Sequence, residues 1–135
     1  MTNRTILLCL LVPILLSAQQ MQDTKPEVLI LTTGGTIASR TDAPLIAGPA
    51  LVQAVPELID YANISVEEFS VIGSSKMTPD NWLRLVQRIN TLFSENENLT
   101  GIVITHGTDT MEEAAYFLNL TVKSDKPVVL VGSMR

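Results

Sequence analysis

The segment Val28-Leu29-Ile30-Leu31-Thr32-Thr33-Gly34-Gly35-Thr36 decides the fold of this 135-residue chain. Its first four residues are all apolar, which is typical of a β-strand buried on both faces of a parallel sheet. The run then changes at once to small hydroxyl and glycine residues, which are typical of a turn. The segment Gly101-Ile102-Val103-Ile104-Thr105-His106-Gly107-Thr108-Asp109 repeats the same pattern. Each segment therefore predicts a central strand followed by a polar turn.

Helical patterns alternate with strand patterns along the rest of the chain. We expect strands at residues 28–31, 69–72, 101–105 and 127–131, and helices at 49–62 (interrupted by Pro56), after Thr78-Pro79-Asp80, and from Met111 to about Val122. Thr78 is the predicted N-cap of the second helix, and Thr110 with Glu113 predicts a capping box for the third. This alternation predicts the α/β fold class, a parallel sheet flanked by helices.

The N-terminal residues predict a secretory signal peptide. Arg4 precedes an apolar run from Ile6 to Leu16, and the small residues Ser17 and Ala18 follow it. The run is shorter than the roughly 20 apolar residues that cross a bilayer, so we expect no stable membrane anchor. We therefore expect a signal peptide at 1–18, a polar linker at 19–26 and one α/β domain at 27–135, in a periplasmic or secreted protein.

Composition excludes several classes of function. The formal net charge is −5, which argues against nucleic-acid binding, because that needs a basic surface. One cysteine, Cys9, and one histidine, His106, cannot form a Cys/His zinc site, so we expect no metal. Gly34-Gly35-Thr36 lacks both the third glycine of a dinucleotide-binding loop and the lysine of a P-loop, so we expect no cofactor.

The carboxyl ends of parallel strands share one edge of the sheet, and ligands bind at that edge. Small polar residues follow all four predicted strands: Thr36, Ser74 with Ser75, Thr108 with Asp109, and Ser133. They predict a site for a small polar molecule. A threonine hydroxyl becomes a nucleophile when a base removes its proton, and Asp109 could bind a substrate ammonium. The alternative, that Thr36 and Thr108 only cap and turn the chain and that Asp109 only favours the helix dipole, has about equal weight from spacing alone.

His106 invites a hydroxyl–His–Asp triad with Asp109. Both residues lie in one short turn, which makes it difficult for Asp109 to hydrogen-bond His106 while His106 contacts a hydroxyl on a third residue. We therefore favour a hydrogen-bonded structural histidine.

Two longer segments resemble the signature motifs of the bacterial-type L-asparaginase/glutaminase family, and the resemblance covers residue 27 to the end. They are Ile30-Leu31-Thr32-Thr33-Gly34-Gly35-Thr36-Ile37-Ala38 and Gly101-Ile102-Val103-Ile104-Thr105-His106-Gly107-Thr108-Asp109-Thr110-Met111. The predicted signal peptide makes the chain similar to the exported, type II branch. The resemblance implies an amidohydrolase that converts L-asparagine, with L-glutamine as a second substrate to test, to the acid and ammonia. It also implies homo-oligomers in the full-length family.

The resemblance also implies a role for each site residue. Thr36 matches the nucleophile that forms the acyl-enzyme, Thr108 matches the second catalytic threonine, and Asp109 matches the acid that holds the substrate α-ammonium. Ser74 and its neighbour Ser75 match the residues that hold the α-carboxylate. Ser133 lies where a backbone carbonyl of the family contacts the substrate amide.

The chain departs from the family pattern in two respects. Residues 39–48, where the family has a lid, are few and contain no tyrosine. The family also continues well beyond the equivalent of Arg135, with an activating lysine and a second domain. The resemblance thus implies a truncated N-terminal asparaginase domain, and we expect these 135 residues alone to be catalytically inactive. A small amino-acid binding module is the alternative function.

Overall fold

The computed structural model describes residues 25–34 and 48–133, which form one α/β unit. The elements in chain order are β1 (Glu27–Thr32), α2 (Gly48–Gln53), α3 (Leu58–Tyr61), β2 (Asn63–Glu68), η2 (Ser74–Lys76), α4 (Pro79–Glu95), β3 (Leu99–Thr105), η3 (Thr108–Thr110), α5 (Met111–Thr121) and β4 (Val128–Val131). The strands form a four-stranded sheet in the order β2-β1-β3-β4. All three strand pairs are parallel, which confirms the predicted fold class.

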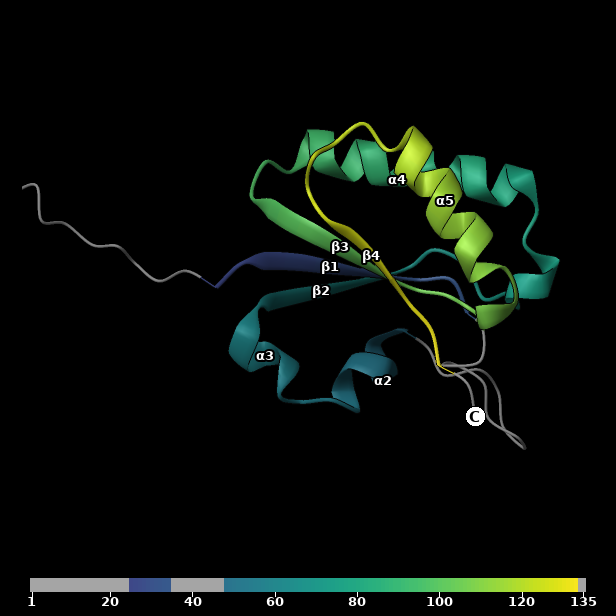
Figure 1. Ribbon diagram of the computed structural model, residues 1–135. Coiled ribbons are helices and arrows are strands. Elements are labelled where there is room, and N and C mark those ends of the chain that lie inside the picture. The colour runs from purple at the N-terminus through teal and green to yellow at the C-terminus, as the bar shows by residue number, and fades with distance from the viewer. Residues whose placement is uncertain (1–24, 35–47, 134–135) are drawn as a thin grey trace, which may run out of the picture.

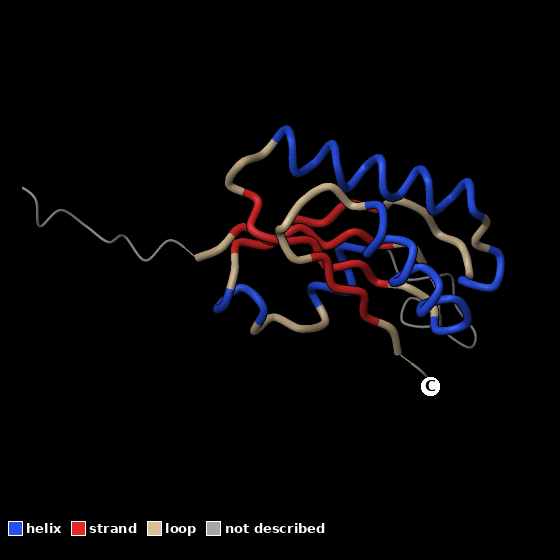
Figure 2. The backbone as a smooth tube through the Cα atoms, turned by 45° about the horizontal axis from the view of Figure 1, so that its top comes forward, coloured by secondary structure: helices blue, strands red, loops and turns tan. Residues whose placement is uncertain are grey.

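The helices cover both faces of the sheet. Figure 1 shows α4 and α5 on one face and the short α2 and α3 on the other. The strands lie side by side and run toward the same edge (Figure 2), as parallel pairing requires. The predicted signal peptide at 1–18 lies outside the described residues, as does most of the predicted linker at 19–26. In the part of the chain that the structure describes, no helix has both the length and the apolar character to cross a membrane.

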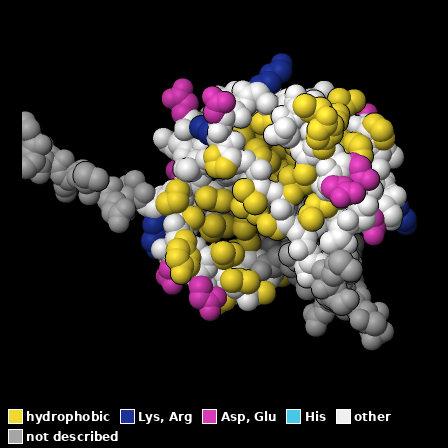
Figure 3. All heavy atoms as spheres, in the orientation of Figure 1, with side chains coloured by type: hydrophobic (Ala, Val, Ile, Leu, Met, Phe, Trp, Pro, Cys, Tyr) yellow, Lys and Arg dark blue, Asp and Glu magenta, His cyan; other side chains and the backbone are white. Residues whose placement is uncertain are grey.

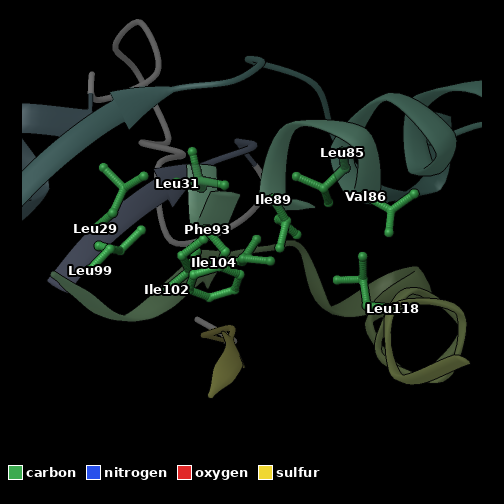
Figure 4. Packing of buried hydrophobic residues seen from close by; sticks show 10 residues of the cluster. All are labelled: Leu29, Leu31, Leu85, Val86, Ile89, Phe93, Leu99, Ile102, Ile104 and Leu118. Carbon is green, nitrogen blue, oxygen red and sulfur yellow. The ribbon is translucent and has the colours of Figure 1, made fainter. Parts of the chain in front are cut away.

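The main core lies between the sheet and the helices α4 and α5. Leu29 and Leu31 of β1 and Ile102 and Ile104 of β3 face the helices, because alternate residues of a strand point to the same side. Their partners are spaced at helical periodicity: Leu85, Val86, Ile89 and Phe93 of α4, and Leu118 of α5 (Figure 4). Burying each such side chain contributes about 1.5–3 kcal/mol, so this layer holds the helices on the sheet.

The second strand lies earlier in the chain than we predicted. We expected it at residues 69–72, but β2 spans Asn63–Glu68. It is an edge strand with only β1 as neighbour, so its residues alternate between polar and apolar instead of forming a continuous apolar run. Phe69 packs against the core after the strand has ended.

The predicted break at Pro56 is confirmed, and one other helix prediction is wrong. Residues 49–62 form two short helices, α2 and α3, with a turn around Pro56 between them. The capping box at Thr110 is wrong, because the Thr110 side chain makes no capping hydrogen bond to α5. The N-cap at Thr78 is confirmed, and its box is completed by Asn81.

Strand β4 leaves one edge of the sheet open. Val129 is 48% exposed, and a groove of 530 Å³ lies between β4 and α5. Apolar side chains gather on this side of the molecule, which is the face that Figure 3 shows. The groove is lined largely by Met111, Ala115, Leu118, Val122 and Val128–Leu130. An apolar edge strand without a second neighbour favours association with other chains.

An ion pair connects the opposite edge of the sheet to α4. Arg88 Nε donates to Oε1 of Glu67 on β2, and Arg88 Nη2 donates to Oε2 of the same carboxylate, each at 2.8 Å. The hydrogen bond from Arg88 is the main cause that lowers the pKa of Glu67 below its usual value. Both side chains are about one-third exposed, so solvent screens the pair.

We predict that Arg88→Met lowers the free energy of unfolding by less than about 1 kcal/mol at pH 7. Because the folded-state pKa of Glu67 is depressed, the pair stabilises the fold above the unfolded-state pKa. That contribution is lost as the pH falls through the folded-state value. Melting temperatures of the parent and variant should therefore converge between about pH 6 and about pH 3. A difference that stays constant over this range would contradict the assignment.

Candidate active site

The candidate site lies at the carboxyl edge of the sheet, where the connections from β1 and β3 diverge. From β1 the chain continues to its neighbour β2 on one side, and from β3 it continues to β4 on the other. Such a divergence leaves a crevice between two strand ends, and ligands bind there in open α/β sheets. The backbone supports this edge beyond the strands, because Thr33 N donates to Thr105 O at 3.1 Å and His106 N donates to Val131 O at 2.9 Å.

Gly34 brings the segment after β2 against the end of β1. Its φ angle is +99°, a conformation that favours glycine. A Cβ at this position would also lie 2.7 Å from both the N and O atoms of Ile72. The residue-72 segment therefore passes directly beside Gly34 and leads to the turn that carries Ser74 and Ser75.

Ser74 and Asp109 meet at this edge although they are 35 residues apart in sequence. The Asp109 backbone N–H donates to Ser74 Oγ at 3.1 Å, and Ser74 Oγ donates to Asp109 Oδ2 at 3.3 Å. Ser74 is only 3% exposed, whereas Asp109 is exposed to solvent. The 3.3 Å bond is long for a hydroxyl donor, so an incoming carboxylate could replace Asp109 as its acceptor.

Gly107 allows this close approach. Its φ and ψ angles, −75° and 154°, are accessible to any residue, so conformation does not require glycine here. The requirement is steric, because a Cβ would overlap Ser74 Oγ and lie 2.7 Å from Ser74 Cβ. Sequence reasoning assigned Gly107 only to a turn and missed this contact.

The remaining predicted residues occupy different parts of the same edge. Thr108 is half-buried beside the turn after β4, where a Cβ on Gly132 would lie 3.2 Å from Thr108 Cγ2. Ser75 is exposed next to Ser74, and Ser133 is exposed after β4. Thr36, the predicted nucleophile, and most of the predicted lid segment lie outside the described residues.

Hydroxyl groups connect the strand ends around the site. Thr33 Oγ1 donates to Thr105 O at 2.8 Å, and Ser70 Oγ donates to Thr33 O at 3.0 Å. Thr110 Oγ1 donates to Ser74 O at 2.9 Å. These three bonds join segments that are 36 to 72 residues apart in sequence. The hydroxyl groups of Thr33, Ser70 and Thr110 thus hold the strand ends together at this edge.

His106 is completely buried below this edge. Its Nδ1 atom lies 2.7 Å from the backbone oxygen of Gly107. Because a carbonyl only accepts, Nδ1 carries the proton. Within residues 25–34 and 48–133, no hydrogen bond joins the ring to Asp109. This geometry favours the structural histidine over the triad. Among the same residues, no three His, Cys, Asp or Glu side chains cluster as metal ligands would.

We predict that Gly107→Ala separates Ser74 from Asp109 and destabilises the fold by about 1–3 kcal/mol, the usual cost of overpacking. Gly73→Ala is the matched control, because a Cβ there meets only Ser75 Oγ at 4.0 Å. Denaturant unfolding compares the two variants with the parent chain. Equal stabilities for the two variants would show that the Gly107–Ser74 contact is not limiting.

Comparisons with known proteins identify the family of this chain. A family model described as "Asparaginase, N-terminal" matches residues 27–135. The chain is 50% identical over 128 residues to L-asparaginase 2 of Bacillus subtilis, an alignment that covers 88% of this chain and 34% of that protein. It is 50% identical over 118 residues to the probable periplasmic L-asparaginase of Haemophilus influenzae, covering 82% of this chain and 33% of that protein.

A solved structure has the same fold. The probable cytoplasmic L-asparaginase from Campylobacter jejuni superposes with a TM-score of 0.77 at 54% identity, over 82% of this chain and 36% of that one. The chain thus spans about a third of the length of the relatives that it matches. These matches confirm the resemblance seen in the two signature segments, and the chain belongs to the asparaginase family, of which it carries the N-terminal portion.

Proposed function

We propose that this chain supplies the nucleophile and the substrate-binding residues of an amidohydrolase that converts L-asparagine to L-aspartate and ammonia. The observation that carries the proposal is the pairing of Ser74 with Asp109 at the carboxyl edge of the sheet. A carboxylate and a hydroxyl in contact suit the two charged groups on the α-carbon of an amino acid. Asp109 binds the α-ammonium, and Ser74 with Ser75 binds the α-carboxylate.

The proposed reaction proceeds through an acyl-enzyme on Thr36. The Thr36 hydroxyl oxygen attacks the side-chain amide carbon of asparagine, and its proton passes to a base. The C–N bond then breaks, and the amide nitrogen leaves as ammonia after gaining a proton. Water attacks the resulting ester, which releases aspartate and restores the hydroxyl. Thr108 is the second catalytic threonine, and the backbone at Ser133 contacts the substrate amide.

The described lysines are poorly placed to serve as that base. The backbone N–H of Lys123 donates to Asn90 Oδ1, and Lys126 Nζ donates to Glu97 O, both at the edge opposite the site. Lys76 is nearer, in η2 next to Ser75, but it is exposed. We infer that the activating base comes from a part of the enzyme that these residues do not include.

We also infer export and assembly from the sequence. The apolar run behind Arg4 supports a signal peptide at 1–18. A polar linker at 19–26 and the catalytic portion from 27 to 135 follow it in this proposal. One relative is named periplasmic and one structural neighbour cytoplasmic, so the leader itself is the argument for a periplasmic or secreted protein. Homo-oligomers in the complete enzyme belong to the same proposal.

We predict that Thr36→Ala abolishes ammonia release in a hybrid enzyme. In the hybrid, residues 27–133 of this chain replace the matching N-terminal portion of the Bacillus subtilis relative. Loss of the nucleophile should lower kcat at least about 10³-fold with asparagine. Thr100→Ala is the control, because Thr100 is exposed near the other end of β3.

Three outcomes of the hybrid assay are informative. Full activity of the Thr36 variant would reject it as the nucleophile. Aspartate binding by calorimetry without any turnover in the parent hybrid would favour the binding module over the enzyme. Parallel assays with glutamine determine which amide the site prefers.

We further predict that the 135 residues expressed alone release ammonia at least about 10²-fold more slowly than the hybrid, because activation by a base contributes about 10²–10⁴ in rate. The exposed apolar strand β4 should also make the isolated chain prone to associate. An ammonia assay on both purified proteins, with light scattering as a control for aggregation, checks this. Equal rates would show that no further base is needed.

A further inference from the structure

The Thr110 hydroxyl has a different role from the one its position suggests. As the residue before α5 it should cap the helix, but it makes no capping bond and donates instead to the backbone oxygen of Ser74 at 2.9 Å. We propose that Thr110 is a positioning residue, which sets the distance between Ser74 and Asp109 and thereby the fit of the amino-acid substrate. This inference rests on the proposed function of that pair.

The two turns that carry the pair are held together by side chains. No backbone–backbone hydrogen bond joins residues 73–77 to residues 107–110 in the described structure. Three bonds cross between them: the Thr110 hydroxyl to Ser74 O at 2.9 Å, and the two Ser74–Asp109 bonds at 3.1 and 3.3 Å. The Thr110 bond is the shortest, and its acceptor is the main chain of Ser74, so it fixes the turn itself.

The other two bonds use the groups that must bind substrate. When the Ser74 hydroxyl donates to a substrate carboxylate, its bond to Asp109 Oδ2 is lost. The Thr110 bond uses neither the Ser74 hydroxyl nor the Asp109 carboxylate, so it persists when substrate is bound. It therefore holds the turns at the separation at which one α-carbon can present its ammonium to Asp109 and its carboxylate to Ser74.

Thr110 acts through Ser74 and Asp109, and the reaction is at the substrate side chain, so the expected effect is on binding. A substitution that weakens binding of the ground state and of the transition state by the same amount raises KM and leaves kcat unchanged. One neutral hydrogen bond corresponds to about a two- to tenfold change in an equilibrium constant. A loss of rate without a change in KM would indicate a different role.

The first test measures asparagine kinetics of Thr110→Val and Thr110→Ser in the hybrid enzyme. Valine keeps the shape and branching of threonine but removes the donor, whereas serine keeps the donor. We expect valine to raise KM about two- to tenfold with kcat within about twofold, and serine to restore the parent KM. Thr121→Val is the control, because Thr121 at the end of α5 also donates to a backbone oxygen, that of Phe117, away from the site.

An unchanged KM in Thr110→Val would overturn the proposal, as would an equal increase in Thr121→Val. A rise in KM that serine does not reverse would also overturn it, because the hydroxyl would then not be the cause.

The second test needs no catalysis and separates this inference from the proposed function. Hydrogen exchange of the Asp109 amide is measured by NMR in the 135-residue chain, at a concentration where light scattering detects no association, because this N–H donates to Ser74 Oγ. Thr110→Val should accelerate its exchange about two- to tenfold, and Thr121→Val should not. If the parent hybrid shows no turnover, the proposed function fails, and this exchange alone decides whether Thr110 holds the turn. Unchanged exchange would reject that role.

Discussion

The pairing of β1 with β3 is the interaction on which the rest of the structure depends. These strands lie side by side although about 70 residues separate them in sequence, and their inward-facing leucines and isoleucines hold α4 and α5. The pairing continues past the strands, where the Thr33 backbone and hydroxyl both donate to Thr105 O. It places the end of β1 beside the end of β3, so the described parts of the two signature segments lie at one edge of the sheet.

Small residues at this edge allow close packing of the chain segments and also belong to the proposed substrate site. Gly34 and Gly107 lie where any side chain would collide with Ile72 or Ser74, which lets the segment after β2 approach both strand ends. The Ser70 and Thr110 hydroxyls add hydrogen bonds between these segments, and the Thr110 bond joins two turns between which the described residues form no backbone–backbone hydrogen bond. The same small polar residues leave room for a substrate, so structure and proposed chemistry depend on the same side chains.

Much of this arrangement could be predicted, and the failures have physical causes. The apolar runs of β1 and β3 are continuous because both faces of those strands are covered, which made them easy to predict. The predicted position of strand β2 was too late in the chain because an edge strand alternates, and because Phe69, which follows β2, packs against the core without belonging to a strand. The capping box at Thr110 is wrong because the Thr110 hydroxyl donates to the backbone oxygen of Ser74, distant in sequence, and accepts no hydrogen bond from the first turn of α5.

The sequence by itself determined the fold class, the order of its elements, the edge that carries the site, and the family, because each of these follows from local periodicity and short motifs. Only the tertiary structure decided which of the small polar residues touch. It paired Ser74 with Asp109, assigned the Thr110 hydroxyl to a second turn, and directed His106 to a carbonyl in a buried position. These contacts join residues on neighbouring strand ends, and their geometry depends on strand register and close packing, which no local pattern records.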